Sequence, residues 1–161
     1  MSLPPDANRL RPDHLPTPFS ARDIRLGCPL GRTILLQSEA PGGEPTFRRI
    51  RFVQVDADAA VQEFQATDAE GGPIGEATRQ RSTWHELQQH ASKPASATAI
   101  DEVDLASPLG TEPCWRYTLN GRDERVTFWF AKDRPGMPVQ VEQEVGGELV
   151  SRSVVIADQV A

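Results

Sequence analysis

The chain has 161 residues, of which 25% are charged and 38% hydrophobic, and its net charge at pH 7 is -6. A chain of this length accommodates one domain with its own hydrophobic core. The acidic balance argues against binding to a nucleic-acid backbone, because proteins that bind one usually present a basic face. A cluster of three arginines does not change this prediction, because on a strand Arg49 and Arg51 share one face while Arg48 lies on the other.

No stretch of the sequence reaches the roughly 18 apolar residues that a transmembrane helix needs. The first residues, MSLPPDANRLRPDH, lack the apolar segment of a secretory signal peptide. We therefore expect a protein without a membrane span that works in the cytoplasm. Its two cysteines, Cys28 and Cys114, are normally reduced there, although the sequence leaves a disulfide between them open.

The N-terminal 20 residues are unusually rich in proline (Pro4, Pro5, Pro12, Pro16 and Pro18). Proline has no backbone N–H group and restricts the residue before it. This composition predicts a flexible tail over residues 1–20 and a single domain over residues 21–161. The domain is expected to begin with a short helix over residues 21–26, which Ser20 can cap and Gly27 can end.

Most of the remaining chain is predicted to form strands joined by short turns. The stretches are rich in β-branched and alternating apolar residues and are bounded by Gly, Pro and Asp; they cover residues 32–38, 47–55, 60–67, 74–81, 98–108, 114–119, 125–131, 138–145 and 149–157. Consecutive strands of this kind favour an antiparallel meander over parallel βαβ units. A sheet of about eight or nine strands tends to curl.

One longer helix is predicted after residue 82. Thr83 and Glu86 form a T-x-x-E capping box, in which the two side chains satisfy backbone N–H groups reciprocally. Trp84, Leu87 and Ala91 follow as one narrow apolar stripe. The predicted fold is therefore α+β and mainly antiparallel β: a curled, half-barrel-like sheet with one covering helix, and with Trp84 as that helix's most buried side chain.

Aromatic residues concentrate in two neighbouring predicted strands, which contain Trp115, Tyr117, Phe128, Trp129 and Phe130. Side chains alternate between the faces of a strand. We expect Phe128 and Phe130 to face the helix-covered hollow together with Trp115 and Tyr117, and Trp129 to face away. The Arg134-Pro135-Gly136 turn that follows reverses the chain, with a positive φ at its glycine.

The loop between these two strands decides which rings meet. A two-residue turn at Asn120-Gly121 is the usual short-range hairpin signal, but it would place Arg116 opposite Arg125. A four-residue loop over 121–124 instead gives three apolar pairs, worth about 0.2–1 kcal/mol each. We predict the longer loop, with Leu119 opposite Val126, Tyr117 opposite Phe128 and Trp115 opposite Phe130.

The sequence contains no pattern that assigns catalytic chemistry. It lacks a G-x-S-x-G elbow, a G-x-G-x-x-G loop and a Walker A loop. His85 and His90 are five residues apart, so on a helix their rings diverge rather than converge on a metal. The acidic run Asp101, Glu102 and Asp104 is interpreted as a solvated face. We therefore predict no catalytic residue, no metal and no cofactor.

Three segments, STWHELQQHASKP, GTEPCWRYTLNG and FWFAKDRPGMPVQVEQEVGGELVSR, resemble a small uncharacterised bacterial family. Its pattern includes T-W-x-E-L-x-x-H-A and F-W-F-A-K-D-x-P-G-x-P-V, and the resemblance covers most of residues 19–156. More distantly, the aromatic strand, Pro-Gly turn and following strand are similar to the curled sheets of lipoprotein-localisation factors. The resemblance implies a half-barrel around a helix whose apolar hollow carries acyl chains, with no catalytic residues to transfer.

These observations favour a non-enzymatic binding or carrier module for an apolar or amphipathic small molecule. Part of the aromatic surface would then line a cavity, and its candidate lining residues are Trp84, Trp115, Tyr117, Phe128 and Phe130. The alternative is a protein-interaction module with a filled core, which would bind a protein partner through a sheet edge or its acidic surface. An enzyme of unknown class is the third possibility. A continuous apolar cavity distinguishes the first from the second.

Overall fold

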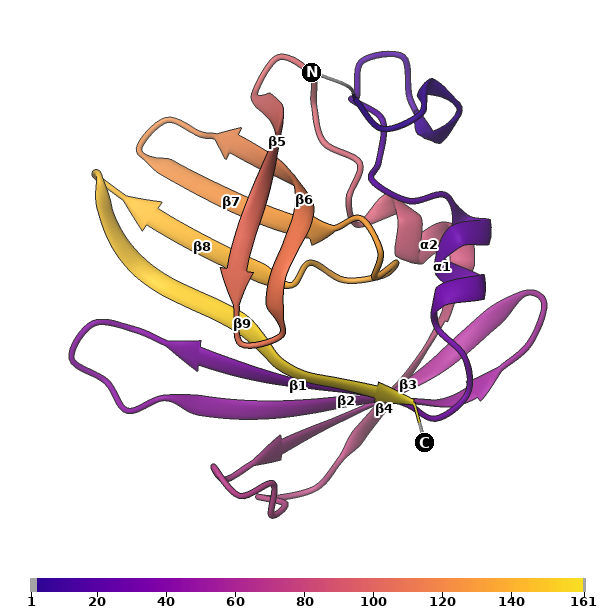
Figure 1. Cartoon of the computed structure of the whole chain (residues 1–161), viewed down its shortest axis with the longest axis vertical. Coiled ribbons are helices and arrows are strands. Elements are labelled where there is room, and N and C mark those ends of the chain that lie inside the picture. Colours follow the sequence, from indigo (N-terminus) through magenta and orange to yellow (C-terminus); the bar gives the residue numbers. More distant parts are fainter. Residues whose placement is uncertain (1–2, 161) are drawn as a thin grey trace.

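The computed structural model describes residues 3–160, which form one nine-stranded sheet with two short α-helices (Figure 1). The strand order is β4-β3-β2-β1-β9-β8-β7-β6-β5. The strands are β1 (Arg32–Glu39), β2 (Thr46–Val55), β3 (Ala59–Thr67), β4 (Thr78–Thr83), β5 (Thr98–Ser107), β6 (Gly110–Asn120), β7 (Glu124–Ala131), β8 (Gln140–Val145) and β9 (Glu148–Val160).

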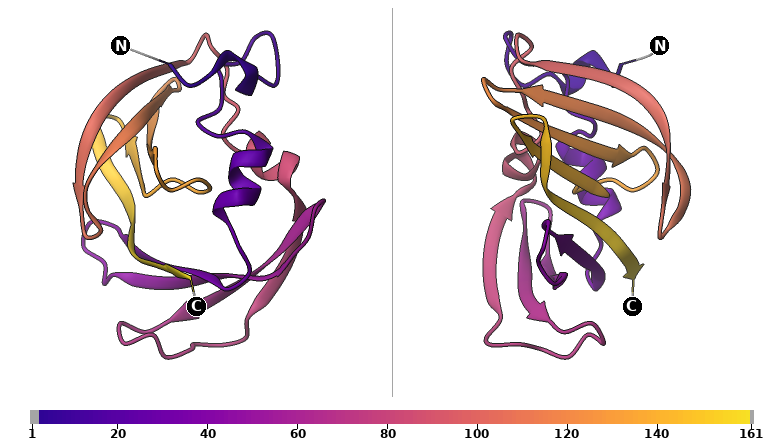
Figure 2. Two further views of the ribbon diagram at one scale, coloured as in Figure 1. Left: turned by 45° about the vertical axis from the view of Figure 1, so that its right-hand side comes forward. Right: turned by 90° about the vertical axis from the view of Figure 1, so that its left-hand side faces the viewer.

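Every pair of neighbouring strands is antiparallel, and the final strand β9 lies between β1 and β8. The two ends of the order, β4 and β5, do not pair with each other, so the sheet is curled but open. Figure 2 shows it wrapping around a hollow, with the helices across the open side. The predicted fold class, an α+β and mainly antiparallel half-barrel-like sheet, is confirmed; α1 covers the sheet together with the one helix predicted to do so, α2.

The two helices, α1 (Ala21–Gly27) and α2 (Trp84–Gln89), lie side by side over the hollow (Figures 1 and 2). The Ala21 N–H donates to Gln88 Oε1 at 2.9 Å and joins them. The capping box predicted at Thr83 and Glu86 is confirmed, and Ser20 caps α1 in the same manner. No helix within residues 3–160 is long and apolar enough to cross a membrane.

The proline-rich segment before α1, for which the sequence predicts a flexible tail, packs into the hollow in this structure. The Tyr117 hydroxyl donates to the Pro16 carbonyl at 2.6 Å, and the Leu15 N–H donates to the Lys93 carbonyl at 3.0 Å. Thr17 is completely buried, and Phe19 is buried among core side chains. The segment is held because it buries apolar surface and because its carbonyls accept hydrogen bonds, neither of which proline prevents.

The β6–β7 hairpin has the predicted register. Leu119 lies opposite Val126, and the two aromatic pairs, Tyr117 with Phe128 and Trp115 with Phe130, also form. The residue opposite Arg116 is Trp129 rather than Arg125. The longer loop is therefore confirmed: apolar cross-strand pairing outweighs the Asn-Gly turn signal here.

The side chains of β7 separate into two hydrophobic clusters. Phe130 and the half-buried Phe128 belong to a cluster that also contains Tyr117 and Trp84. Trp129 belongs to a second cluster with Ile34, Ile50, Cys114, Ala131, Val139 and Val155. Trp129 therefore packs in a different cluster from Phe128 and Phe130, as the alternation of side chains along a strand predicts.

Candidate ligand-binding cavity

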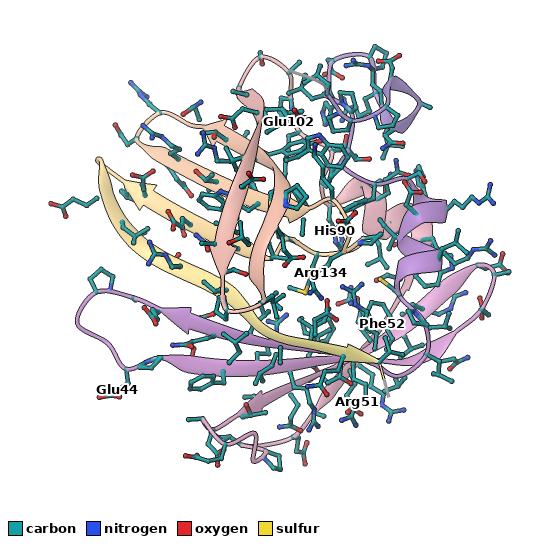
Figure 3. All side chains as sticks on the ribbon, in the orientation of Figure 1. Glu44, Arg51, Phe52, His90, Glu102 and Arg134 are labelled. Atoms are coloured by element: carbon teal, nitrogen blue, oxygen red, sulfur yellow. The ribbon has the colours of Figure 1, made fainter. Side chains whose placement is uncertain are left out.

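A cavity of about 350 Å³ lies in the hollow between the helices, β2–β4 and β7. Figure 3 labels two residues that line it, Phe52 on β2 and His90 just after α2. Its full lining is Ile24, Cys28, Arg48, Ile50, Phe52, Gln62, Phe64, Gln80, Ser82, Leu87, His90, Ala91, Phe128, Phe130, Gly136, Met137 and Pro138.

The floor of the cavity is apolar and buried. Ile50 and Phe52 alternate with outward-facing residues along β2, so they share the inner face of the sheet. Ile24 of α1 and Phe130 of β7 complete this floor, and all four side chains are at most 5% exposed. A molecule bound here would contact aliphatic and aromatic carbon.

The two side walls come from distant parts of the chain. Phe64 on β3 and Phe128 on β7 are both half-buried and line the cavity, although several strands separate them in the sheet order. The curl of the sheet brings the two walls toward each other. Leu87 of α2 and Ala91, which follows this helix, also line the space.

The polar groups lie mainly at the rim. Arg48, Gln80 and His90 are exposed where they line the cavity, whereas the floor residues are buried. The Arg48 guanidinium lies over the Phe64 ring, with Cζ 4.8 Å from the ring centroid. On the other wall, Lys93 Nζ lies 4.9 Å from the centroid of Phe128. A cation therefore sits over an aromatic ring on each wall.

The β7–β8 loop, which supplies Gly136, Met137 and Pro138 to the cavity, is fixed by Arg32. One guanidinium nitrogen of Arg32 donates to the Gly27 carbonyl at 2.9 Å and to the Pro135 carbonyl at 2.6 Å. The other two nitrogens donate to the Asp158 carboxylate at 3.0 and 2.7 Å. Arg32 thus ties the end of α1 and this loop to β1 and β9.

Asp158 is the counter-charge of this buried network, and Arg134 also approaches it, at 3.4 Å. Burial alone would raise the pKa of the Asp158 carboxyl. The hydrogen bonds and positive charges of Arg32 and Arg134 outweigh burial, so the pKa lies below its ordinary value. The network is therefore fully charged at neutral pH.

Gly136 has the positive φ predicted for this turn, at 124°. A Cβ at this position would lie 3.2 Å from Cys28 Sγ and 3.3 Å from a guanidinium nitrogen of Arg32. Both the backbone conformation and the close approach therefore require glycine.

The structure distributes the five candidate residues over two places. Phe128 and Phe130 line the cavity. The adjoining core cluster contains Trp84 and Tyr117, and Trp115 packs against it. The Trp84 indole N–H donates to the Asp56 carbonyl at 3.0 Å. Trp84 is 4% exposed, the same exposed fraction as Gln88, so these two side chains are the most buried in α2.

The cavity residues on β2–β4 and in the β7–β8 loop were not among the sequence candidates. A signal existed for β2, because Arg48, Ile50 and Phe52 alternate within FRRIRFVQV and so share a face. This alternation does not predict that Phe64 and Phe128 lie on opposite walls of one cavity, because their positions in space depend on the curl of the whole sheet.

The two cysteines are free: Cys28 lines the cavity, and Cys114 belongs to the second hydrophobic cluster. Within residues 3–160, no group of three or more His, Cys, Asp or Glu side chains is arranged to hold a metal ion.

Comparisons with known proteins relate this chain to others by fold. No protein-family model matches it, so the family pattern identified in the sequence is not confirmed, and no curated protein matches. A Bacteroides fragilis structure, described as an exported-protein candidate with a YmcC-like fold, aligns over 81% of this chain and 96% of its own, with a TM-score of 0.50 and 12% identity.

Two further structures align similarly. MucB aligns over 86% of this chain and 56% of its own, with a TM-score of 0.56 and 12% identity. A hypothetical protein from Chlamydia trachomatis aligns over 88% of this chain and 93% of its own, with a TM-score of 0.52 and 9% identity. This chain therefore shares its curled-sheet fold with them, and identities this low carry the fold alone.

Proposed function

We propose that this protein is a binding or carrier module for an apolar or amphipathic small molecule, which occupies the cavity between β2–β4 and β7. The observation that supports this proposal best is the cavity itself, of about 350 Å³, with an apolar floor and a polar rim. Small-molecule sites commonly measure about 300–1,000 Å³ and combine mostly apolar walls with a few polar groups.

The energetics of packing support the same proposal. Protein interiors contain few voids larger than a water molecule. Here the rings of Phe64 and Phe128 remain half-buried on opposite walls of a space that the described chain does not fill. A ligand that covered these rings would remove apolar surface from water, at about 25 cal/mol per Å².

The five aromatic candidates take two roles in this proposal. Phe128 and Phe130 contact the ligand directly. Trp84, Trp115 and Tyr117 support the wall and helix that shape the cavity. Phe130 connects the two groups, because its ring packs edge-on against Tyr117, with centroids 5.3 Å apart, and also lines the cavity.

A neutral fluorescent probe such as N-phenyl-1-naphthylamine tests the proposal. The native protein should bind it, and Phe128→Ser should weaken binding because the substitution makes one wall polar. Phe47→Ser is the matched control, because Phe47 is also half-buried but lies outside the cavity lining. Circular dichroism should show that both variants fold. A native protein that binds no such probe would contradict the proposal.

A protein-interaction module is the second candidate, and one surface favours it. Val145, Leu149 and Val150, at the tip of the β8–β9 hairpin, are 45%, 36% and 37% exposed. Exposed apolar patches of this kind can mark contacts with a protein partner. Loss of partner binding in Val150→Ser, together with an absence of probe binding, would favour this function over the carrier.

The location in the cytoplasm also remains a proposal. Two free, buried cysteines are consistent with a reducing compartment. Cell fractionation of the source organism, followed by native mass spectrometry of the purified protein, would test both the compartment and the presence of a bound small molecule.

A further inference from the structure

We infer that the ligand is a single-chain amphiphile with an anionic head group, which Arg48 at the cavity rim and Lys93 beside Phe128 attract while the chain lies on the apolar floor. This inference rests on the proposed function and names the chemistry of its ligand. It excludes neutral and cationic amphiphiles as the preferred occupants.

The sign of the cavity's charge is the first observation. The chain contains 23 acidic and 17 basic residues and has a net charge of -6. The cavity is nevertheless lined by Arg48 and His90, with no Asp or Glu among its residues. Acidic residues outnumber basic ones in the chain, but the cavity lining contains no acidic residue. The cavity is therefore electrostatically complementary to an anion.

The state of the two cations is the second observation. Neither Arg48 nor Lys93 forms an ion pair with a carboxylate within residues 3–160. Several other cations on the sheet are paired; Arg32, Arg79, Arg116 and Lys132 each lie within 3.1 Å of an acidic oxygen. Arg48 and Lys93 therefore keep their N–H donors free of acidic partners, and such donors suit an oxyanion.

The position of these cations is the third observation. Arg48 lines the cavity and lies over the Phe64 ring, whereas Lys93 lies outside the lining, over the Phe128 ring. A chain held between the two rings would bring its head group to the level of the cations. Burial lowers the pKa of Lys93 below its ordinary value, and a bound anion would counter this effect.

The size of the cavity limits the chain. A methylene group occupies somewhat less than the roughly 30 Å³ share of a water molecule. A cavity of about 350 Å³ therefore suits one chain of about a dozen carbons at that volume. Carboxylates and phosphate monoesters present the same anionic oxygens to arginine, so a fatty acid and an alkyl phosphate are the two sources of this chemistry.

The inference can be tested by displacing the neutral fluorescent probe with four amphiphiles that have a twelve-carbon chain, each used below its critical micelle concentration. They are dodecanoate, dodecyl phosphate, dodecanol and dodecyltrimethylammonium. We expect at least one anion to bind about tenfold more tightly than dodecanol, the effect of one charge-assisted contact. The tighter of the two anions identifies the source of the head group. Dodecyltrimethylammonium should bind most weakly.

Two variants assign the preference to its residues. Arg48→Gln combined with Lys93→Gln should remove the preference, so that the anions bind this variant no more tightly than dodecanol binds the same variant. Arg122→Gln is the matched control: it removes the same charge from an exposed loop residue outside the cavity lining, and should retain the preference. In the native protein, 500 mM NaCl should weaken anion binding more than dodecanol binding, because salt screens the charges at the rim.

The outcomes separate the inference from the function on which it rests. Equal binding of dodecanol and both anions, or an unchanged preference in the double variant, overturns the inference while the carrier function stands. A native protein that binds neither dodecanol nor the probe overturns both.

Discussion

The hollow of the curled sheet is filled beside β5 and β6 and open between β7 and β2–β4. In the filled region, Pro16, Thr17 and Phe19 of the N-terminal segment pack near Tyr117 and Trp115. In the open region, the walls that carry Phe64 and Phe128 enclose the cavity. Both regions belong to the same concave surface, so the sheet alone does not decide whether its hollow is filled.

The difference shows how the chain divides this hollow. Phe130 belongs to both regions: its ring lies 6.5 Å from that of Phe19, centroid to centroid, and also lines the cavity. The N-terminal segment thus fills the space up to Phe130, and beyond this ring the cavity begins. The following substitutions test this difference.

The largest difference is expected between two Phe→Ala substitutions. Phe19→Ala should lower the free energy of unfolding by about 3–5 kcal/mol, as large-to-small core substitutions do. Phe128→Ala should cost only about 1–2 kcal/mol, because the ring is half-buried and already borders open space. Urea unfolding measures both. Similar losses in the two variants would mean that the two regions are packed alike.

Asp158→Asn tests the network that fixes the β7–β8 loop at the edge of the open region. It should cost about 3 kcal/mol at pH 7, because it leaves the buried Arg32 without its principal counter-charge. The variant should also bind the neutral probe more weakly, since the loop carries Met137 and Pro138.

The pH dependence of this effect has a definite sign. The folded-state pKa of Asp158 lies below its value of about 3.9 in an unfolded chain. Its stabilising contribution is therefore complete above about pH 4 and decreases as the pH falls through the folded-state pKa. The stability difference between the native protein and Asp158→Asn should shrink below about pH 4 in urea melts. A constant difference from pH 7 to pH 3 is incompatible with this account.

Two Ala→Leu substitutions test the same comparison in the other direction. Ala60 is 1% exposed and packs in the core cluster, so Ala60→Leu should cost about 1–3 kcal/mol through overpacking. Ala91 lines the cavity, so Ala91→Leu should leave stability nearly unchanged and reduce probe binding. A large loss of stability in Ala91→Leu would indicate that the cavity is already filled.

The smallest effect concerns the reactivity of the two thiols. Burial raises the pKa of Cys28, and burial with nearby acidic groups raises that of Cys114 to about 11. Both should therefore react slowly with Ellman's reagent at pH 8, since the thiolate is the reactive form. A cavity ligand should slow the reaction of Cys28 further and leave Cys114 unaffected, as mass spectrometry of the labelled peptides can show.

The local features of this fold could be predicted from the sequence. The Thr83–Glu86 capping box, the register that pairs Tyr117 with Phe128, and the positive φ of Gly136 each depend on residues close together in the sequence. Each also has a strong physical signal: reciprocal hydrogen bonds, apolar pairing and a conformation that suits glycine.

The division of the hollow could not be predicted in this way. The five prolines of residues 1–20 are typical of an extended segment, and composition does not reveal that Pro16 accepts a hydrogen bond from Tyr117. The cavity likewise depends on how far the sheet curls between β3 and β7. Both outcomes depend on contacts between residues distant in the sequence.

A crystal structure with 12-bromododecanoate tests the central claim most directly, because anomalous scattering locates the bromine without bias. Our account predicts bromine density at the apolar floor beside Ile50 and Phe52, with the carboxylate at Arg48. A structure in which the native side chains close the space between Phe64 and Phe128, with bromine absent from the hollow, would contradict it.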